Sequence, residues 1–435
     1  MSADGFKVRH VDLSTAHTSP ERGAALSVFW WKDLPLGTQA SLCEELPYSH
    51  PRLRQLASEF AAAQLEARSS ELGAPLRATY EGWPKPELSL ATAAGIENPV
   101  KSLDSVACSS SLPGDEISVV ICTRNRGSAL SDCLRSVSAQ RSPPGEIIVV
   151  DNSSDGNARG LCAEFSRVRY VHEPRPGLSV ARNAGIRASR LTIVAFTDDD
   201  VEVHPGWTAE VARAFADRNI EAFTGLVLPA RLDTAAQRFF QFTLGGFGTT
   251  FVPLIFDRRF FEETRPSGAH VWKIGAGANM AFRRSVFERI GMFDERLGAG
   301  AAGCSEDSEI WYRLLATGGA CLYEPRAVVF HHHRSDWPGL KRQIRAYMKG
   351  HVAALLVQYD NFGDRGNIVR ICKQLPAYFL RTFVKSLLQG PPGRLGILAA
   401  EVQGWVAGLQ YALRLGWRKR RIPVRMVANA NEETV

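Results

Sequence analysis

The sequence predicts an α/β protein in which helices cover both faces of a Rossmann-like sheet. Three observations indicate this fold class: continuous apolar runs, polar residues directly after each run, and helical periodicity between them. The runs are residues 117–122, 146–150 and 193–196. Uninterrupted Val and Ile runs of this length are typical of parallel strands that are buried on both faces.

The segments between these runs have the spacing of amphipathic helices. Residues 128–140 carry Leu130, Leu134 and Val137 on one helical face. Residues 177–189 form the second predicted helix, after a further strand. The expected order is therefore strand, helix, strand, then another strand and helix, and finally a strand at 193–196.

The last of these strands leads into Asp198-Asp199-Asp200. Ligands bind at the carboxyl ends of strands in open α/β sheets, so these acids are placed where a ligand would lie. Clustered carboxylates repel one another unless a cation neutralises them, and their hard oxygens favour Mg²⁺ or Mn²⁺. A solvated acidic turn is the alternative interpretation. The polar residues after the other two runs favour a ligand site, because three polar strand ends would meet at one edge.

Residues 117 to about 334 resemble the family 2 glycosyltransferases of the GT-A fold, over about half of the chain. Seven blocks carry the resemblance, in order: 119–125 (Val-Val-Ile-Cys-Thr-Arg-Asn), 150–156 (Val-Asp-Asn-Ser-Ser-Asp-Gly), 177–186 (Gly-Leu-Ser-Val-Ala-Arg-Asn-Ala-Gly-Ile), 196–200 (Phe-Thr-Asp-Asp-Asp), 277–284 (Gly-Ala-Asn-Met-Ala-Phe-Arg-Arg), 290–295 (Ile-Gly-Met-Phe-Asp-Glu) and 305–310 (Ser-Glu-Asp-Ser-Glu-Ile). The resemblance implies a mixed GT-A sheet and a nucleotide-sugar donor.

The resemblance also implies roles for residues at the strand ends. Asp200 would be a direct metal ligand, and Asp198 would bind the ribose or help to hold the metal, while Asp199 would face away. Arg182 would face the diphosphate, although a surface helix position is the alternative. The residues matched to nucleoside binding are Thr123, Arg124, Asn125 and Asp151, with Asp151 near the base.

The segment 305–315 predicts a helix whose first turn is acidic, with Ser305 as its N-cap. Capping alone explains part of this pattern. The resemblance implies that Asp307 is the general base for the acceptor hydroxyl and that Glu306 orients the acceptor. A helix N-terminus favours the ionised carboxylate that a base requires. Trp311 is expected in the core.

Three histidines follow the apolar segment 327–330. Alternate side chains of a strand point to opposite faces, so all three cannot bind one ion. The resemblance implies that His331 completes the metal site, and His333 shares its face; a surface tract is the alternative.

Residues 298–303 spell G-x-G-x-x-G, but no buried strand precedes them, so we expect a flexible loop beside the acceptor rather than a dinucleotide site.

The 435 residues are enough for two or three domains. We expect an accessory α/β domain and Ser-rich linker (1–114), a catalytic domain (115–337), a basic helical region (338–421) and a tail (422–435). Within the first, residues 26–37 predict a strand leading to a Pro/Gly turn, and 50–67 predict a helix. The chain shows no signal peptide, no apolar run long enough for a membrane span and no C-x-x-C motif, which predicts a cytoplasmic protein without disulfides or structural zinc.

The C-terminal region is strongly basic. Residues 334–421 contain sixteen Lys and Arg against four Asp and Glu. Basic and apolar residues alternate within 368–388, and a further helix is expected at 397–415. This pattern is typical of helices that lie on an anionic membrane surface, so peripheral binding to the inner face of the cytoplasmic membrane is expected. An ordinary helical domain with a basic face is the alternative, and nucleic acid is not expected as a partner.

Three functions fit these observations to different degrees. The favoured one is a metal-dependent, inverting glycosyltransferase that uses Mn²⁺ or Mg²⁺ and a nucleotide sugar, with UDP as the expected carrier, and acts on a glycan or lipid-linked hydroxyl. A nucleotidyltransferase would need a Gly-rich loop with Arg and Lys after its first strand, and 123–128 lacks that form. A non-catalytic sugar-binding scaffold would be expected to lack the metal acids or Asp307.

Overall fold

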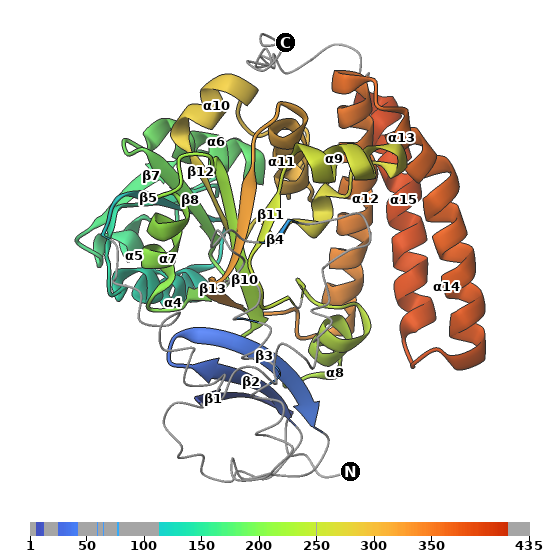
Figure 1. Ribbon diagram of the computed structural model, residues 1–435, viewed down its shortest axis with the longest axis horizontal. Helices are drawn as coiled ribbons and strands as arrows, with labels where there is room; N and C mark the ends of the chain where they lie inside the picture. The colour runs from blue at the N-terminus through green and yellow to red at the C-terminus, as the bar shows by residue number, and fades with distance from the viewer. Residues whose placement is uncertain are drawn as a thin grey trace, which may run out of the picture.

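The computed structural model describes residues 6–12, 25–41, 59, 64, 76–77, 113–248 and 250–415. A central mixed sheet holds most strands (Figure 1). In spatial order its strands are β4 (Leu76–Arg77), β11 (Leu254–Phe256), β13 (Cys321–His331), β10 (Ala222–Pro229), β12 (Asn279–Arg283), β8 (Ile193–Asp198), β5 (Gly114–Thr123), β6 (Pro144–Asp151) and β7 (Val168–His172), while β9 (Val201–Val203) pairs with β13.

The strands β8, β5, β6 and β7 run parallel to one another. The strand β12 runs antiparallel to both β8 and β10, which makes the sheet mixed. The three strands predicted from apolar runs are β5, β6 and β8, and their predicted ends are adjacent: Cys122 pairs with Asp198, and Thr123 pairs with Asp151. The predicted fold class, a Rossmann-like mixed sheet flanked by helices, is confirmed.

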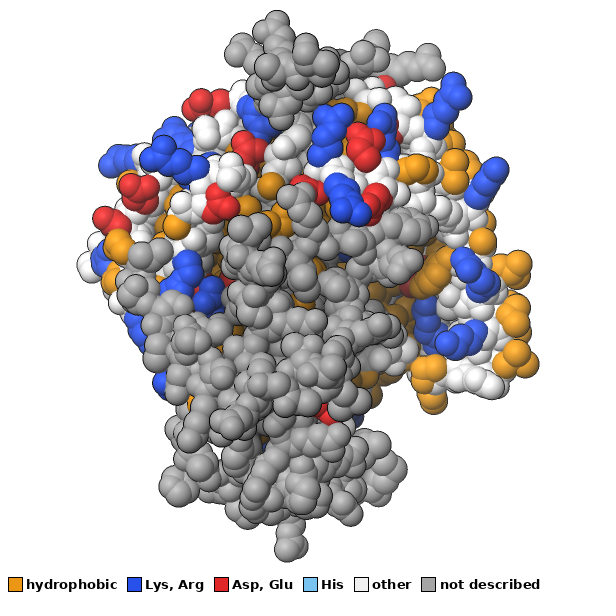
Figure 2. Space-filling view, in the orientation of Figure 1, with side chains coloured by type: hydrophobic (Ala, Val, Ile, Leu, Met, Phe, Trp, Pro, Cys, Tyr) orange, Lys and Arg blue, Asp and Glu red, His pale blue; other side chains and the backbone are white. Residues whose placement is uncertain are grey.

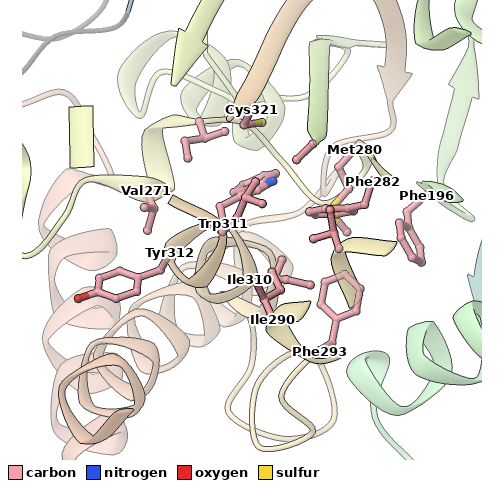
Figure 3. Packing of buried hydrophobic residues seen from close by; sticks show 14 of the residues in the cluster. Phe196, Val271, Met280, Phe282, Ile290, Phe293, Ile310, Trp311, Tyr312 and Cys321 are labelled. Atoms are coloured by element: carbon pink, nitrogen blue, oxygen red, sulfur yellow. The ribbon is translucent and has the colours of Figure 1, made fainter. Parts of the chain in front are cut away.

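Helices cover both faces of this sheet. They are α4 (Gly127–Ser138), α5 (Arg159–Ala163), α6 (Leu178–Ala188), α7 (Trp207–Ala214), α8 (Ala235–Arg238), α9 (Arg258–Thr264), α10 (Arg284–Ile290) and α11 (Glu306–Ala316). On one face Val120 and Phe196 pack with residues of α6, α10 and α11, and on the other Val119 and Ile121 pack with α4 and α7. Trp311 is fully buried in the first of these cores, as predicted (Figure 3).

A small three-stranded sheet precedes the central one, with β1 (Lys7–Asp12), β2 (Ala25–Trp31) and β3 (Leu34–Ser41). The predicted turn at Pro35 and Gly37 is wrong, because the chain turns at Lys32 and Asp33, where Lys32 has φ of 54°. Pro35 is tolerated in β3 because β3 is an edge strand of this sheet.

Two further predictions for this N-terminal part lie largely outside the described residues. Of the predicted helix at 50–67 only Glu59 and Gln64 are described, both as helical, and the predicted linker at 102–114 is described only at its end.

The small sheet packs on the central one through Val28 and Trp30, which contact apolar residues of β10 and β13.

Up to residue 415, where the description of the chain ends, the C-terminal region contains four α-helices: α12 (Trp337–Phe362), α13 (Arg365–Val369), α14 (Leu375–Gln389) and α15 (Arg394–Leu415). A π-helical turn at Arg370–Gln374 joins α13 to α14. The expected break at residues 391–393 separates α14 from α15. Long α12 packs along α15 and also against α11, so this region lies against the sheet rather than apart from it (Figure 1). Among the described helices, none has the length and apolarity needed to cross a membrane.

Candidate active site

A cavity of about 1530 Å³ lies at the carboxyl ends of β5 and β8. The start of α11 and residues from α12, α14 and α15 complete its walls. Of the residues predicted from the sequence, the cavity lining contains Thr123, Arg124, Arg182, Asp198, Asp200, Glu306, Asp307 and His331. Residues separated by more than 200 positions therefore meet in one place, as the predicted convergence of strand ends required.

The three adjacent aspartates differ in their contacts. The Asp198 side chain is about a third exposed and lies 3.2 Å from Nη2 of Arg182. Asp199 is buried and accepts hydrogen bonds from Oγ1 of Thr123 (2.8 Å) and Nη1 of Arg126 (2.9 Å). Burial raises the pKa of Asp199 to about 6, although Arg126 opposes this. The Asp199 side chain is thus occupied by the protein itself.

Asp200 and His331 face one another across the floor of the cavity. Oδ1 of Asp200 lies 3.6 Å from Nε2 of His331, and at this separation both atoms can bind the same metal ion. The pairing of β9 with β13 sets this approach, because His331 pairs with Val201, the residue after Asp200. Burial lowers the pKa of His331, and the neutral imidazole is the form that binds a metal.

The residues present fit a divalent ion that shares its ligands with a phosphate. Within the described ranges, no group of three or more His, Cys, Asp or Glu side chains is arranged to hold a metal alone. Mg²⁺ is commonly held by one or two carboxylates together with substrate phosphates, so Asp200 and His331 are sufficient as the protein's share. His333 lies on the same face, with its Nδ1 3.0 Å from Nδ1 of His331, whereas His332 turns to Glu202.

Arg126 was not predicted from the sequence. Its Nη1 atom lies 2.9 Å from Asp199 and 2.7 Å from Asp200, so it joins the two carboxylates. Burial alone would raise the pKa of Asp200, but His331, Arg126 and Arg334 together lower it. The sequence did contain a signal for Arg126: like Arg124, this arginine lies in the polar segment directly after β5.

Arg182 forms ion pairs with two carboxylates. Its guanidinium is buried between Glu306, at 2.6 Å, and Asp198, at 3.2 Å, and it also donates to the carbonyl of Gly277. Burial disfavours the cation, but the two carboxylates raise the pKa of Arg182. The alternative of a surface helix position is excluded, because Arg182 is buried and positions Asp198 and Glu306. The predicted contact with a diphosphate stays a prediction.

Glu306 is correspondingly buried. Burial raises the pKa of Glu306 to about 7, against the influence of Arg182. Its Oε1 is held by Arg182, whereas Oε2 is buried without a hydrogen-bond partner among the described residues. The predicted role of Glu306 in orienting an acceptor stays a prediction.

Asp307 stands at the start of α11 and borders the cavity. Its Oδ2 accepts a hydrogen bond from the backbone N–H of Gly277 at 2.9 Å, and its Oδ1 accepts one from the N–H of Ser308 at 2.6 Å. These two bonds fix the carboxylate's direction. The predicted capping by Ser305 is wrong, because Ser305 adopts a left-handed φ of 70° and its side chain makes no cap hydrogen bond.

Two of the residues matched to nucleoside binding do not reach the cavity. The Asp151 carboxylate is fully buried and accepts hydrogen bonds from Ser153, Ala158 and Tyr170. Asn125 has φ of 59° and accepts from Asn157. Both lie outside the cavity lining, so they shape the loops after β5 and β6 rather than line the site.

Asn152, the residue after Asp151, does line the cavity, as Arg124 does. Its amide also binds the carbonyls of Glu173 and Arg175 and the N–H of Gly177, which joins the loop after β6 to the start of α6.

The loop at 298–303 borders the cavity, as predicted for a loop beside the acceptor. Its glycines have φ values of 90° (Gly298), 88° (Gly300) and 117° (Gly303), which favour glycine. The loop is held in place, since the carbonyl of Ala301 accepts a hydrogen bond from Nζ of Lys349 on α12.

This chain is similar to known glycosyltransferases. The family described as Glycosyl transferase family 2 matches residues 118–291. A pre-mycofactocin glycosyltransferase of Mycobacterium tuberculosis is 27% identical over 252 residues, which cover 57% of this chain and 48% of that protein. This chain therefore spans about half the length of that relative.

Two other proteins are also similar to this chain. A glucosyl-dolichyl phosphate glucuronosyltransferase of Haloferax volcanii is 23% identical over 69% of this chain and 94% of its own length. Among solved structures, a mannosyltransferase of Pyrobaculum calidifontis in complex with GDP-Man and Mn²⁺ superposes with a TM-score of 0.44 and 16% identity, covering 74% of this chain and 94% of that one.

Proposed function

We propose that this protein, whose residues 118–291 match the family described as Glycosyl transferase family 2, is a metal-dependent inverting glycosyltransferase that uses a nucleotide sugar. One observation carries the proposal: Asp200 with His331, and Asp307 at the start of α11, border the same cavity at the strand ends. A donor site for an activated sugar and a base for an acceptor are the two parts that this reaction needs.

On the donor side, Thr123 ends β5, Arg124 follows it, and both contribute to the cavity wall. We infer that Arg124 and Asn152 contact the nucleoside, and that UDP is the carrier to test first. Asp200 and His331 would hold a divalent ion, with Asp198 beside them. When bound, such an ion neutralises the charge that develops on the leaving diphosphate. Arg182 keeps Asp198 in place through its ion pair.

On the acceptor side, Asp307 would accept the proton of the attacking hydroxyl at either of its oxygens. Its two backbone hydrogen bonds restrict rotation of the carboxylate, so it meets the acceptor in a defined orientation. A single displacement assisted by one base inverts the configuration of the anomeric carbon. The acceptor hydroxyl belongs to a glycan or a lipid-linked molecule in this proposal; the name of the Haloferax relative includes a dolichyl phosphate.

Isothermal titration with UDP and GDP, each with and without Mn²⁺, tests the donor half. We expect one of the two nucleotides to bind with an affinity that falls when Mn²⁺ is removed. Hydrolysis of a panel of nucleotide sugars would then identify the sugar. Absence of Mn²⁺-dependent binding for both nucleotides would contradict the proposal. Release of pyrophosphate from a nucleoside triphosphate and a sugar 1-phosphate would show a nucleotidyltransferase instead.

A further inference from the structure

The cavity wall formed by the C-terminal helices is basic. From residue 337 onward, the cavity lining contains four arginines, at 342, 370, 381 and 394, and one carboxylate, Glu401. That carboxylate is already engaged, because Oε2 of Glu401 lies 3.2 Å from Nη1 of Arg394. The wall therefore carries cationic charge that no acidic side chain of these helices balances.

Arg342 and Arg381 of this wall are exposed, whereas Arg370 is only partly exposed. Its Nε donates to Nε2 of His351 at 3.0 Å, and its Nη1 donates to Gln374 at 3.1 Å, both neutral acceptors. No carboxylate of the described residues forms an ion pair with it. Burial lowers the pKa of Arg370 to about 10, in contrast to Arg182, whose carboxylate partners raise its pKa. A buried cation without a counter-ion is costly, and binding an anion would remove that cost.

The Arg370 guanidinium is also held rigidly. It stacks on the ring of Trp272 at 3.8 Å from the ring centre, while Trp272 packs edge-on against His351. Gly268 packs on its aliphatic part, since a Cβ on that glycine would stand 3.1 Å from Cβ and Cδ of Arg370. These contacts pre-organise the guanidinium for a ligand in the cavity.

The position of Arg370 associates it with the acceptor rather than the donor. Trp272 belongs to the segment that leads to Gly277, and the N–H of Gly277 binds Asp307, the proposed base. Arg370 comes from the C-terminal helical region, whereas the metal acids follow β8 on the central sheet. A ligand at Arg370 therefore lies on the wall that adjoins the base.

We infer that Arg370 binds a phosphate group carried by the acceptor, with Arg342 and Arg381 adding charge on the same wall. The planar fork of an arginine binds phosphate oxygens through two parallel hydrogen bonds, and several nearby cations suit a group with more than one negative charge. This inference rests on the proposed glycosyl transfer and names the chemistry of its acceptor. The phosphate can belong to a lipid or to a soluble sugar phosphate.

The test compares three full-length variants with the parent protein. Arg370→Gln removes the cation, Arg370→Lys keeps the charge without the fork, and Lys373→Gln removes an exposed charge from the same turn outside the cavity. Glucose 6-phosphate is titrated calorimetrically in the presence of saturating UDP and Mn²⁺, so that the donor half is occupied. Vesicles of phosphatidylcholine with phosphatidic acid provide the lipid phosphate, and vesicles with phosphatidylserine match their charge.

We expect Arg370→Gln to weaken binding of one phosphate probe by roughly 10- to 100-fold, the usual worth of a charge-assisted hydrogen bond. Arg370→Lys should weaken it less, and Lys373→Gln should match the parent. Tighter binding to vesicles with phosphatidic acid than to vesicles with phosphatidylserine would identify a lipid phosphate. Binding of glucose 6-phosphate would identify a soluble phosphate. Melting temperatures of the variants establish that each is folded.

Three results would overturn the inference. The first is that Arg370→Gln and Lys373→Gln bind the phosphate probe equally well. The second is that the parent binds neither phosphate probe. The third is a loss of UDP affinity in Arg370→Gln, which would assign Arg370 to the donor. Failure of the proposed function looks different. In that case UDP and GDP do not bind the parent, while the Arg370-dependent binding of a phosphate probe persists.

Discussion

Three consecutive aspartates at the end of β8 have three environments, and these decide what each can do. Asp198 is held by Arg182 and remains partly exposed, while Asp199 is buried against Thr123 and Arg126. Asp200 faces His331. Asp199 has two donors and stabilises the loop. Asp200 also accepts from Arg126, through Oδ2, while its Oδ1 faces His331.

Replacing Asp200 with Ala should abolish Mn²⁺-dependent binding of the nucleoside diphosphate while the fold is retained. In the proposed function the carboxylate would be a metal ligand, and it contributes no apolar packing. The matched control is Glu202→Gln, which changes an exposed carboxylate two residues away that pairs with His332. Calorimetric titration with and without Mn²⁺ measures the effect. Unchanged Mn²⁺-dependent affinity in the Ala variant would refute the assignment of Asp200.

Asp307→Asn keeps the shape of the side chain but cannot accept a proton. We expect turnover to fall by roughly 10²- to 10⁴-fold, the usual contribution of a positioned base. Donor affinity should change little, because Asp307 lies at α11 rather than at the strand ends. Steady-state kinetics together with donor titration separate the two effects. Near-normal turnover would mean that another group is the base, and Glu306 would be the first to test.

At the scale of elements, the loop 298–303 connects the catalytic sheet to the C-terminal helices. Gly303 contacts the α12 backbone so closely that a Cβ on it would stand 2.7 Å from the carbonyl oxygen of Ala346. One helical turn further along α12, Gly350 packs on Cys304 in the same way. Small residues thus let α12 approach the loop that precedes α11, and this contact closes the cavity wall.

Gly303→Ala should therefore destabilise the protein more than a left-handed φ alone explains. The control is Gly318→Ala, since Gly318 has φ of 86° and no atom within 4 Å of an added Cβ. The control should cost about 1–2 kcal/mol, the usual penalty for a side chain in the left-handed region. The Gly303 variant should lose more because α12 must also shift. Urea denaturation of both variants measures this, and equal losses would show that the contact with α12 adds nothing.

At the scale of the whole molecule, the C-terminal helices have two different faces. Their inner side walls the cavity, while the outer side of α14 exposes Leu380, Leu387 and Leu388 at 65%, 60% and 76%. Figure 2 shows this face, with basic side chains between apolar ones along the edge that α14 forms. Exposed leucines among Lys and Arg are typical of a helix that lies on an anionic bilayer. Membrane binding stays a prediction.

Removing the whole C-terminal region would also remove the cavity wall, so it would not test membrane binding alone. Replacing Leu387 and Leu388 with Ser is sharper. The control is Leu413→Ser, because Leu413 is also exposed, at 83%. It lies near the C-terminal end of α15, roughly 29 Å along the helix from Arg394, where α15 begins after α14.

We expect the double variant to lose sedimentation with anionic vesicles by roughly tenfold or more, since each buried Leu contributes about 1.5–3 kcal/mol. High salt should weaken binding of the parent, because the basic residues are screened. Failure of the parent to sediment at low salt would make this face an ordinary surface or an oligomer contact.

The sequence by itself determined what depends on local order along the chain. Apolar runs indicated β5, β6 and β8, and helical spacing indicated α4 and α6. The rule that ligands bind at strand ends then predicted where Asp198 and Asp200 would lie. Periodicity and strand direction are properties of short segments, so these predictions needed no knowledge of distant contacts.

Only the tertiary structure decided which distant side chains meet. It brought His331 to Asp200 through the pairing of β13 with β9, and it placed Arg182 between Asp198 and Glu306. It also buried Asp151, which the sequence matched to a ligand contact. The enclosure of Arg370 has the same origin. Partners and burial are set by packing between elements far apart in the chain, and one sequence does not record that packing.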